Sequence, residues 1–270
     1  MRYFIRLSYD GSAFCGWQIQ ENANSVQEEL QNALTTLLKE PVSITGAGRT
    51  DSGVNAINYI AHFDTCLLKM PPDNYLKQNP IQNVGYLVYK INAILPAQIC
   101  VHEIFSVPNN LHARFDAISR TYKYFIHTTK DPFHSKFSFY ISPNKIDINK
   151  MNQAAQFFIG EHDFSSLEKV NGGNKTSICN VSEAYWSPIK DDFTITKDGK
   201  DTRYVFTVTA NRFLRNMVRA MVGSLLEVGS GKRPVEWIAT MLEEKNRSSA
   251  GSSVPGNALF LYNISYLNNF

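Results

Sequence analysis

The sequence predicts an α+β protein made of two similar sheet-plus-helix halves with a cleft between them. Patterns typical of strands and of helices occur in both halves of the 270-residue chain. They break near residues 108–112, and no internal repeat or low-complexity segment is visible. We therefore expect an N-terminal half, residues 1–107, and a C-terminal half, residues 108–270, each with a sheet backed by helices.

The N-terminal half is expected to begin with a strand over Arg2–Tyr9, which is rich in aromatic and branched residues. Ser25 and Glu28 form a capping-box signature, and the apolar residues that follow have helical spacing. Three further strands are predicted at residues 42–46, 58–64 and 100–108. Residues 67–95 mix prolines and asparagines and predict a helix only near their end.

The C-terminal half is expected to begin with a strand over Ser119–His127, whose alternation places Tyr122 and Tyr124 on one face. A polar hairpin region is predicted at residues 190–201. The other predicted elements are helices at residues 149–159, 212–229 and 234–245 and strands at residues 181–186, 203–211 and 258–267.

Composition places the chain among globular proteins, since 43% of its residues are apolar. The net charge of +3 permits an anionic partner but does not require one. The four cysteines form no CxxC pair, which argues against a zinc knuckle or a disulfide scaffold, and we expect buried thiols. The N-terminus lacks a signal-peptide pattern, and no apolar run approaches the ~20 residues of a membrane span, so a cytoplasmic protein is expected.

The stretch GAGRTDSGVN, residues 46–55, is the strongest local signal. It lacks the Lys-Ser/Thr of a phosphate-binding loop, has Asp51 where a dinucleotide fingerprint has its third glycine, and offers too few ligands for a metal. Two interpretations remain. The stretch is a structural turn with a surface Arg49–Asp51 ion pair, or it presents an ionised carboxylate as a nucleophile or base to a planar, bulky substrate.

Four separated motifs resemble the tRNA pseudouridine synthase A family. They are YDGSAFCGWQ, GRTDSGVNA, HARFDAISRTYKY and FLRNMVRAMVGSLLEVG, and they occur in the family's order over essentially the whole chain. Asn55 stands where the family usually has His, and Ser52 where it often has Ala. Neither departure replaces a catalytic side chain. Residues 67–95 are longer than in typical bacterial members.

The resemblance implies the pseudouridine synthase fold with a basic active-site cleft. It also implies an isomerase that converts uridine to pseudouridine at positions 38, 39 and 40 in the anticodon stem–loop of tRNAs. Such an enzyme uses no metal, nucleotide or redox cofactor, and it works as a homodimer. Three alternatives stay open: a synthase acting on another tRNA position or RNA, an inactive RNA-binding relative, and a phosphate-handling enzyme, which the missing lysine disfavours.

The resemblance also assigns site residues. Asp51 matches the essential aspartate, in the N-terminal half. Arg49 would fill the space left by the uridine when it leaves the stack. Tyr122 would pack on the target base, and its hydroxyl is a candidate for the C5 proton transfer. Arg219 would reach into the cleft and pair with Asp51. Tyr124 is expected in the core.

The spacing of Arg212, Arg215 and Arg219 predicts that they share one helix face. Arg212 and Arg215 are candidates for phosphate contacts, which position RNA without reading its sequence. Apolar residues of the same helix and two aromatic residues near the first turn are expected to fill the core: Phe14, Trp17, Met217, Val218, Met221, Val222 and Leu225.

Overall fold

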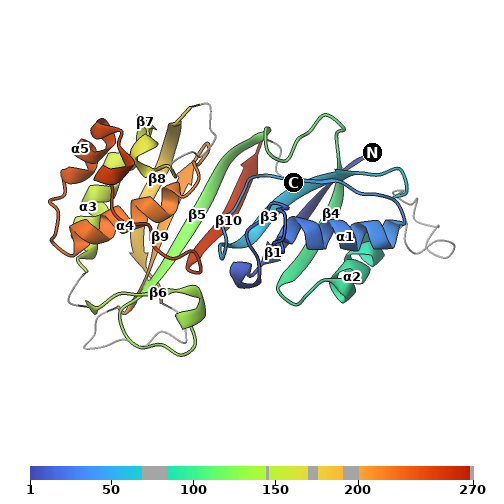
Figure 1. Cartoon of the computed structure of the whole chain (residues 1–270), viewed down its shortest axis with the longest axis horizontal. Helices are drawn as coiled ribbons and strands as arrows, with labels where there is room; N and C mark the ends of the chain where they lie inside the picture. The colour runs from blue at the N-terminus through green and yellow to red at the C-terminus, as the bar shows by residue number, and fades with distance from the viewer. Residues whose placement is uncertain (69–83, 144–145, 170–175, 191–200, 268–270) are drawn as a thin grey trace. The chain divides into compact units, whose positions relative to one another are not determined.

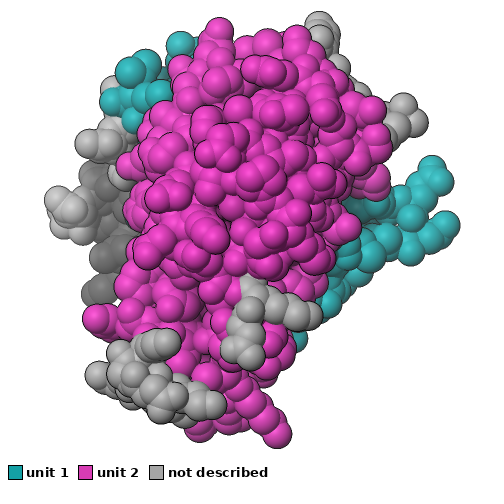
Figure 2. All heavy atoms as spheres, turned by 90° about the vertical axis from the view of Figure 1, so that its left-hand side faces the viewer, with its two compact units in different colours: residues 1–118, 261–270 teal, residues 119–260 magenta. Residues whose placement is uncertain are grey.

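A computed structural model describes residues 1–68, 84–143, 146–169, 176–190 and 201–267. The chain forms two compact units (Figure 2). Unit 1 comprises residues 1–118 and 261–270, and unit 2 comprises residues 119–260. The two units are defined only by contacts between residues. The predicted N-terminal and C-terminal halves, divided between residues 107 and 108, therefore stay a prediction.

Unit 1 contains a sheet with the strand order β4-β1-β3-β10, in which β2 pairs with β3 (Figure 1). β1 runs antiparallel to both β3 and β4. The last strand returns to unit 1 from Leu261 onward. The elements are β1 (Arg2–Tyr9), the 3-10 helix η1 (Gly11–Ala13), α1 (Val26–Leu38), β2 (Ile44–Gly46), β3 (Asn55–Asp64), α2 (Val84–Ile94), β4 (Ile99–Val107) and β10 (Leu259–Tyr266).

The predicted elements of unit 1 form for the expected physical reasons. Ser25 caps α1, because its side chain accepts the backbone N–H of Glu28. Leu30 and Leu34 are fully buried on the inner face of this helix. The helix ends at Leu38, where Lys39 adopts a left-handed conformation. The helix expected near the end of residues 67–95 is α2, while residues 69–83 lie outside the described part of the chain.

Unit 2 contains strands in the order β5-β9-β8-β7, each antiparallel to its neighbour, with β6 parallel to β5 (Figure 1). α3 packs beside α4 and β8. The predicted hairpin region at 190–201 lies almost wholly outside the described residues. The main elements are β5 (Ala117–His127), β6 (Phe139–Tyr140), α3 (Ile148–Ala155), β7 (Gly160–Asp163), β8 (Ile178–Pro188), β9 (Arg203–Ala210), α4 (Met217–Gly229) and α5 (Trp237–Glu244).

Two predicted helices begin later than the sequence indicated. α4 begins at Met217 and not at residue 212, because Asn216 adopts a left-handed conformation with φ of 70°. α5 begins at Trp237, whose N–H is accepted by the carbonyl of Pro234. The expected core is confirmed, since each of its members is at most 4% exposed: Phe14, Trp17, Met217, Val218, Met221, Val222 and Leu225.

The expectation of buried thiols is wrong for three of the four cysteines. Cys15, Cys66 and Cys100 are exposed, and only Cys179 is buried. Burial raises the pKa of the Cys179 thiol to about 11. In the part of the chain that the structure describes, no helix has the length and apolar character needed to cross a membrane.

Candidate active site

The GAGRTDSGVN stretch connects β2 to β3, as the sequence predicted. Arg49 is exposed and Asp51 is partly exposed. The carbonyl of Asp51 accepts the N–H of Val54 at 3.1 Å, and Gly53 has a positive φ of 75°. A glycine at the third position of such a turn accommodates this φ without strain. Asp51 is therefore the first residue of a hydrogen-bonded four-residue turn, and this turn fixes its backbone.

Tyr59 on β3 holds the loop on the side before Arg49. Its hydroxyl donates to the carbonyl of Gly48 and accepts the N–H of the same residue at 3.4 Å. The Tyr59 ring stacks on Trp17 with 4.1 Å between ring centroids. A Cβ at Gly46 would lie 2.2 Å from the Tyr59 hydroxyl and 2.5 Å from the Trp17 indole nitrogen. Glycine is therefore the only residue type that fits at position 46, beneath this aromatic pair.

Thr50 fixes the loop on the other side of Arg49. Its hydroxyl shares a buried hydrogen bond of 2.9 Å with the hydroxyl of Tyr9. Its carbonyl accepts the N–H of Trp17 at 3.4 Å. A Cβ at Gly16 would lie 2.3 Å from the same carbonyl oxygen, so the two segments touch through backbone. Contacts at Gly48 and Thr50 thus fix the chain immediately before and after Arg49.

The two departures from the family pattern both contact the first turn of the chain. Asn55 is 1% exposed, and its Oδ1 accepts the N–H of Gly11 at 2.8 Å. Ser52 Oγ donates to the carbonyl of Phe14 at 3.4 Å. A Cβ at Gly11 would lie 2.2 Å from the carbonyl oxygen of Val54. Asn55 is therefore a buried structural residue that joins the end of the loop to η1.

Tyr122 lies on β5 of unit 2, opposite Val208 of β9. It is partly buried, and its ring meets that of Phe213 edge to face, with 5.0 Å between centroids. Tyr124, on the same strand face, is fully buried and donates to the carbonyl of Pro255 at 3.0 Å. Burial raises the pKa of the Tyr124 phenol. The prediction that Tyr124 is a core residue is confirmed.

The predicted common helix face of the three arginines is wrong. Arg212 and Arg215 precede α4, and only Arg219 lies on the helix, because Asn216 interrupts the helical conformation. Arg212 Nη1 donates to the carbonyl of Thr176 at 3.2 Å. The carbonyl of Arg215 accepts the N–H of Lys169 at 3.0 Å. The two side chains therefore belong to a turn between β9 and α4.

Arg219 is joined to residue 254 by two hydrogen bonds. Its Nε donates to the carbonyl of Val254 at 2.7 Å, and its own carbonyl accepts the N–H of Val254 at 3.2 Å. The direction of the guanidinium is therefore fixed by the backbone of the segment that leads into β10. Sequence spacing gave no sign of this partner, which lies 35 residues away.

Sequence reasoning missed the residues that support the loop, Tyr9 and Tyr59, and the Tyr122 partner Phe213. The predicted strand at residues 58–64 is the one sequence signal near Tyr59, and Tyr59, Ala61 and Phe63 on one of its faces are all buried. This signal could not indicate that the Tyr59 hydroxyl is hydrogen-bonded to both the carbonyl and the N–H of Gly48. Among the described residues, no group of three or more His, Cys, Asp or Glu side chains could hold a metal ion.

Comparison with known proteins gives a consistent result. A family model described as tRNA pseudouridine synthase matches residues 154–267. The tRNA pseudouridine synthase A of Bacteroides thetaiotaomicron is 44% identical over 265 residues, which cover 98% of this chain and 90% of that protein. The enzyme of the same name from Shewanella amazonensis is 37% identical over 273 residues, covering 100% of this chain and 95% of that protein.

A solved structure, the archaeal box H/ACA sRNP Nop10-Cbf5 complex, aligns with 94% of this chain and 58% of that chain. The sequence identity is 11% and the TM-score 0.31, a likeness too weak to support an argument. The relatives carry the conclusion by themselves, because their identity extends over nearly the full length of both proteins. The chain belongs to the tRNA pseudouridine synthase A family.

Proposed function

We propose that this protein is an isomerase that converts uridine to pseudouridine at positions 38, 39 and 40 in the anticodon stem–loop of tRNAs. The observation that carries the proposal is the full-length identity to proteins named tRNA pseudouridine synthase A. The Arg49–Asp51 loop with its buried supports is consistent with that reaction, which needs a carboxylate held in one place.

Asp51 is the proposed catalytic residue. The reaction breaks the bond between N1 of uracil and the sugar and forms a bond from C5 to the same sugar carbon. C5 loses a proton and N1 gains one, so that the product is an isomer of uridine. A carboxylate serves as a nucleophile toward sugar or base, or as the base that removes a proton. The backbone of Asp51 is closed into a turn with Val54, and Thr50 before it is anchored to Tyr9. This support favours a group that must be positioned before the substrate arrives.

Three further side chains have proposed roles around the target uridine. Arg49 occupies the space that the uridine leaves in the RNA stack, and its exposure suits this role. Tyr122 packs on the uracil ring, and its hydroxyl is the candidate for the C5 proton transfer. Arg219 is the proposed cation that pairs with the Asp51 carboxylate.

The proposed RNA contacts are electrostatic. Arg212 and Arg215 lie on the turn before α4 and would bind phosphates, which positions the RNA without reading its sequence. The affinity for tRNA should then fall steeply as salt is added. We also propose that the protein works in the cytoplasm as a homodimer, with the tRNA contacting both subunits, and that it needs no metal or cofactor.

A pseudouridine map tests the proposal. Unmodified tRNAs are incubated with the protein without added cofactor, and pseudouridines are located chemically along each RNA. Product at positions 38, 39 and 40 is the expected result. Product at other positions would support the proposed reaction but assign it to a different uridine of the RNA. Binding of tRNA without any product would favour an inactive RNA-binding relative and contradict the proposal.

A further inference from the structure

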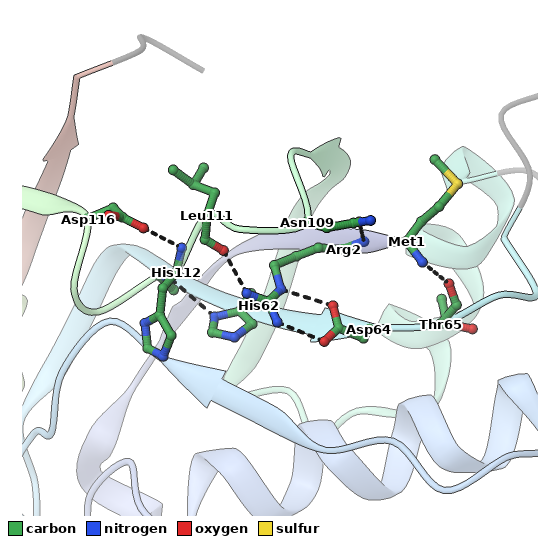
Figure 3. Close-up of polar contacts among 10 residues, drawn as sticks. Met1, Arg2, His62, Asp64, Thr65, Asn109, Leu111, His112 and Asp116 are labelled. Atoms are coloured by element: carbon green, nitrogen blue, oxygen red, sulfur yellow. Dashed lines mark hydrogen bonds and ion pairs between the residues drawn. The ribbon is translucent and has the colours of Figure 1, made fainter.

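The turn between β4 and β5, residues 108–116, is held in place by charged and polar contacts to β1 and β3 (Figure 3). Arg2 donates from Nε and Nη2 to the two oxygens of Asp64, at 2.9 and 2.8 Å. Its Nη1 donates to the carbonyl of Leu111 at 3.0 Å. Within the turn, the N–H of His112 donates to Asp116 Oδ2 at 2.6 Å. A turn with these contacts keeps its shape in the absence of a partner.

Two histidines complete this support. Nδ1 of the buried His62 accepts the N–H of Ala113 at 3.1 Å, and Nδ1 of His112 accepts those of Arg114 and Phe115 at 3.0 and 3.3 Å. The two rings meet edge to face, with 4.6 Å between centroids (Figure 3). Desolvation lowers the pKa of both, that of His62 to about 4. Both rings therefore stay neutral and accept these bonds at neutral pH.

The side chain that this turn presents is an exposed phenylalanine. Phe115 is 76% exposed. Its ring lies 4.3 Å from that of His112, centroid to centroid, with 32° between the planes. The guanidinium of Arg114 lies 5.7 Å from the Phe115 centroid. The ring thus has the His112 imidazole against it and the Arg114 guanidinium over it, and most of its surface still faces solvent.

We propose that Phe115 and Arg114 form a stacking site for an unpaired nucleobase of the RNA substrate, outside the proposed catalytic residues. The inference rests on the proposed function, since it takes its ligand class from the tRNA. Every base has a π-face that stacks on an aromatic ring, and an adjacent arginine binds the phosphate or stacks on the base. Beside Phe115 the turn carries His112 and the cationic Arg114, which fits RNA better than an apolar protein surface, and the Asp116 carboxylate is engaged by the N–H of His112.

Phe115→Ala tests the stacking site in a tRNA-binding titration. Loss of one base–aromatic stack is expected to weaken binding by roughly 5- to 150-fold and to raise KM, with kcat retained at saturating tRNA. Phe115→Trp keeps a stacking surface and should bind as the wild type does. Its added indole should be quenched by tRNA, after subtraction of the wild-type signal. Tyr89→Ala is the matched control, because Tyr89 on α2 is also an exposed aromatic residue, at 67%.

The outcomes separate this site from the proposed function. Wild-type affinity in Phe115→Ala, or an indole at 115 that tRNA does not quench, would overturn the stacking site even if pseudouridine forms normally. An equal loss of affinity in Tyr89→Ala would also overturn it. A wild-type protein that binds tRNA and makes no pseudouridine would contradict the proposed function, while the binding comparison still decides the stacking site. If Phe115→Ala fails to fold, Phe115→Leu, which keeps the apolar volume without the ring face, takes its place.

Discussion

The two segments that carry most of the proposed site residues are supported in different ways. The Gly46–Asn55 loop is held by buried side chains, with the Tyr59 hydroxyl on Gly48, the Tyr9 hydroxyl on Thr50, and Trp17 stacked behind them. The segment of residues 211–216 is a surface turn whose described contacts include hydrogen bonds to backbone carbonyls and N–H groups. The carboxylate is thus placed on a loop held by buried hydroxyls and rings, while Arg212 and Arg215 lie on a turn held mainly through backbone groups.

The largest effect is expected from Gly46→Ala. The new Cβ would lie within 2.5 Å of two aromatic side chains that are themselves buried, so the loop or the Trp17–Tyr59 pair must move. We expect a loss of about 3 kcal/mol in the free energy of unfolding, at the upper end of the range for overpacked sites. Urea unfolding gives the stability, and single-turnover pseudouridine formation gives the rate, which should fall as well.

Gly48→Ala is the matched control two residues away. Among the described residues, nothing lies within 4 Å of a Cβ at this position. The free energy of unfolding of Gly48→Ala should stay within about 0.5 kcal/mol of that of the wild type. Equal destabilisation by the two alanines would contradict the claim that the loop is held from its Gly46 side.

Tyr59→Phe is expected to have the next largest effect. Removal of the hydroxyl takes away the partner of the Gly48 carbonyl and N–H, which costs about 1–3 kcal/mol when such groups stay buried. Because the loop would then hold Asp51 less firmly, kcat should fall more than KM rises. Steady-state kinetics and unfolding are measured together.

Tyr3→Phe provides the comparison for that variant. Tyr3 on β1 is also fully buried, and its hydroxyl donates to the carbonyl of Leu68 at 2.8 Å, outside the loop. It should lose similar stability and keep its kcat. A drop in kcat of the same size in both variants would show that stability, and not the position of Asp51, limits the reaction.

A smaller effect is expected at the start of α4. Asn216 has a φ of 70°, and its Nδ2 donates to Ser253 Oγ at 2.6 Å. Asn216→Ala should cost about 1–2 kcal/mol, because alanine is strained in this conformation and the hydrogen bond is lost. Asn216→Gly removes the strain and loses only the bond, so it should fall between alanine and the wild type in thermal unfolding. A more stable alanine variant would indicate that α4 extends to residue 212 in solution.

The effect expected to matter least at neutral pH is a pH dependence in the turn that supports Phe115, since it acts only below pH 6.5. The pKa of His62 is lowered in the folded state to about 4 from 6.5, mainly by burial, with Arg2 and His112 acting in the same direction and Asp64 opposing. The unfolded chain then takes up a proton first as the pH falls. Stability is therefore fully present above pH 6.5, declines between pH 6.5 and 4, and levels off below.

Urea unfolding as a function of pH checks this dependence. His62→Asn keeps an acceptor near the N–H of Ala113 and removes the titrating group. It should flatten the decline between pH 6.5 and 4, whatever its own stability. An unchanged slope would show that other groups dominate in that range.

The sequence predicted the strands on both sides of the Asp51 loop. The apolar residues there have the spacing of strands, and the glycines between them indicate a loop. It could not place the start of α4, since residues 212–216 are compatible with a helix. What stops the helix is a left-handed Asn216 bonded to Ser253, 37 residues away. The supports of the loop were missed for the same reason, because Tyr9, Trp17 and Tyr59 meet only in the folded protein.

The proposed catalytic role of Asp51 is tested by single-turnover pseudouridine formation in Asp51→Asn, with tRNA binding measured on the same samples. Asparagine has nearly the same shape as aspartate and removes the charge. We expect wild-type affinity for tRNA within a few-fold and a rate at least about 1,000-fold lower, as for loss of an essential catalytic group. Product formed by Asp51→Asn at close to the wild-type rate would contradict the assignment of Asp51, and with it the role given to the loop.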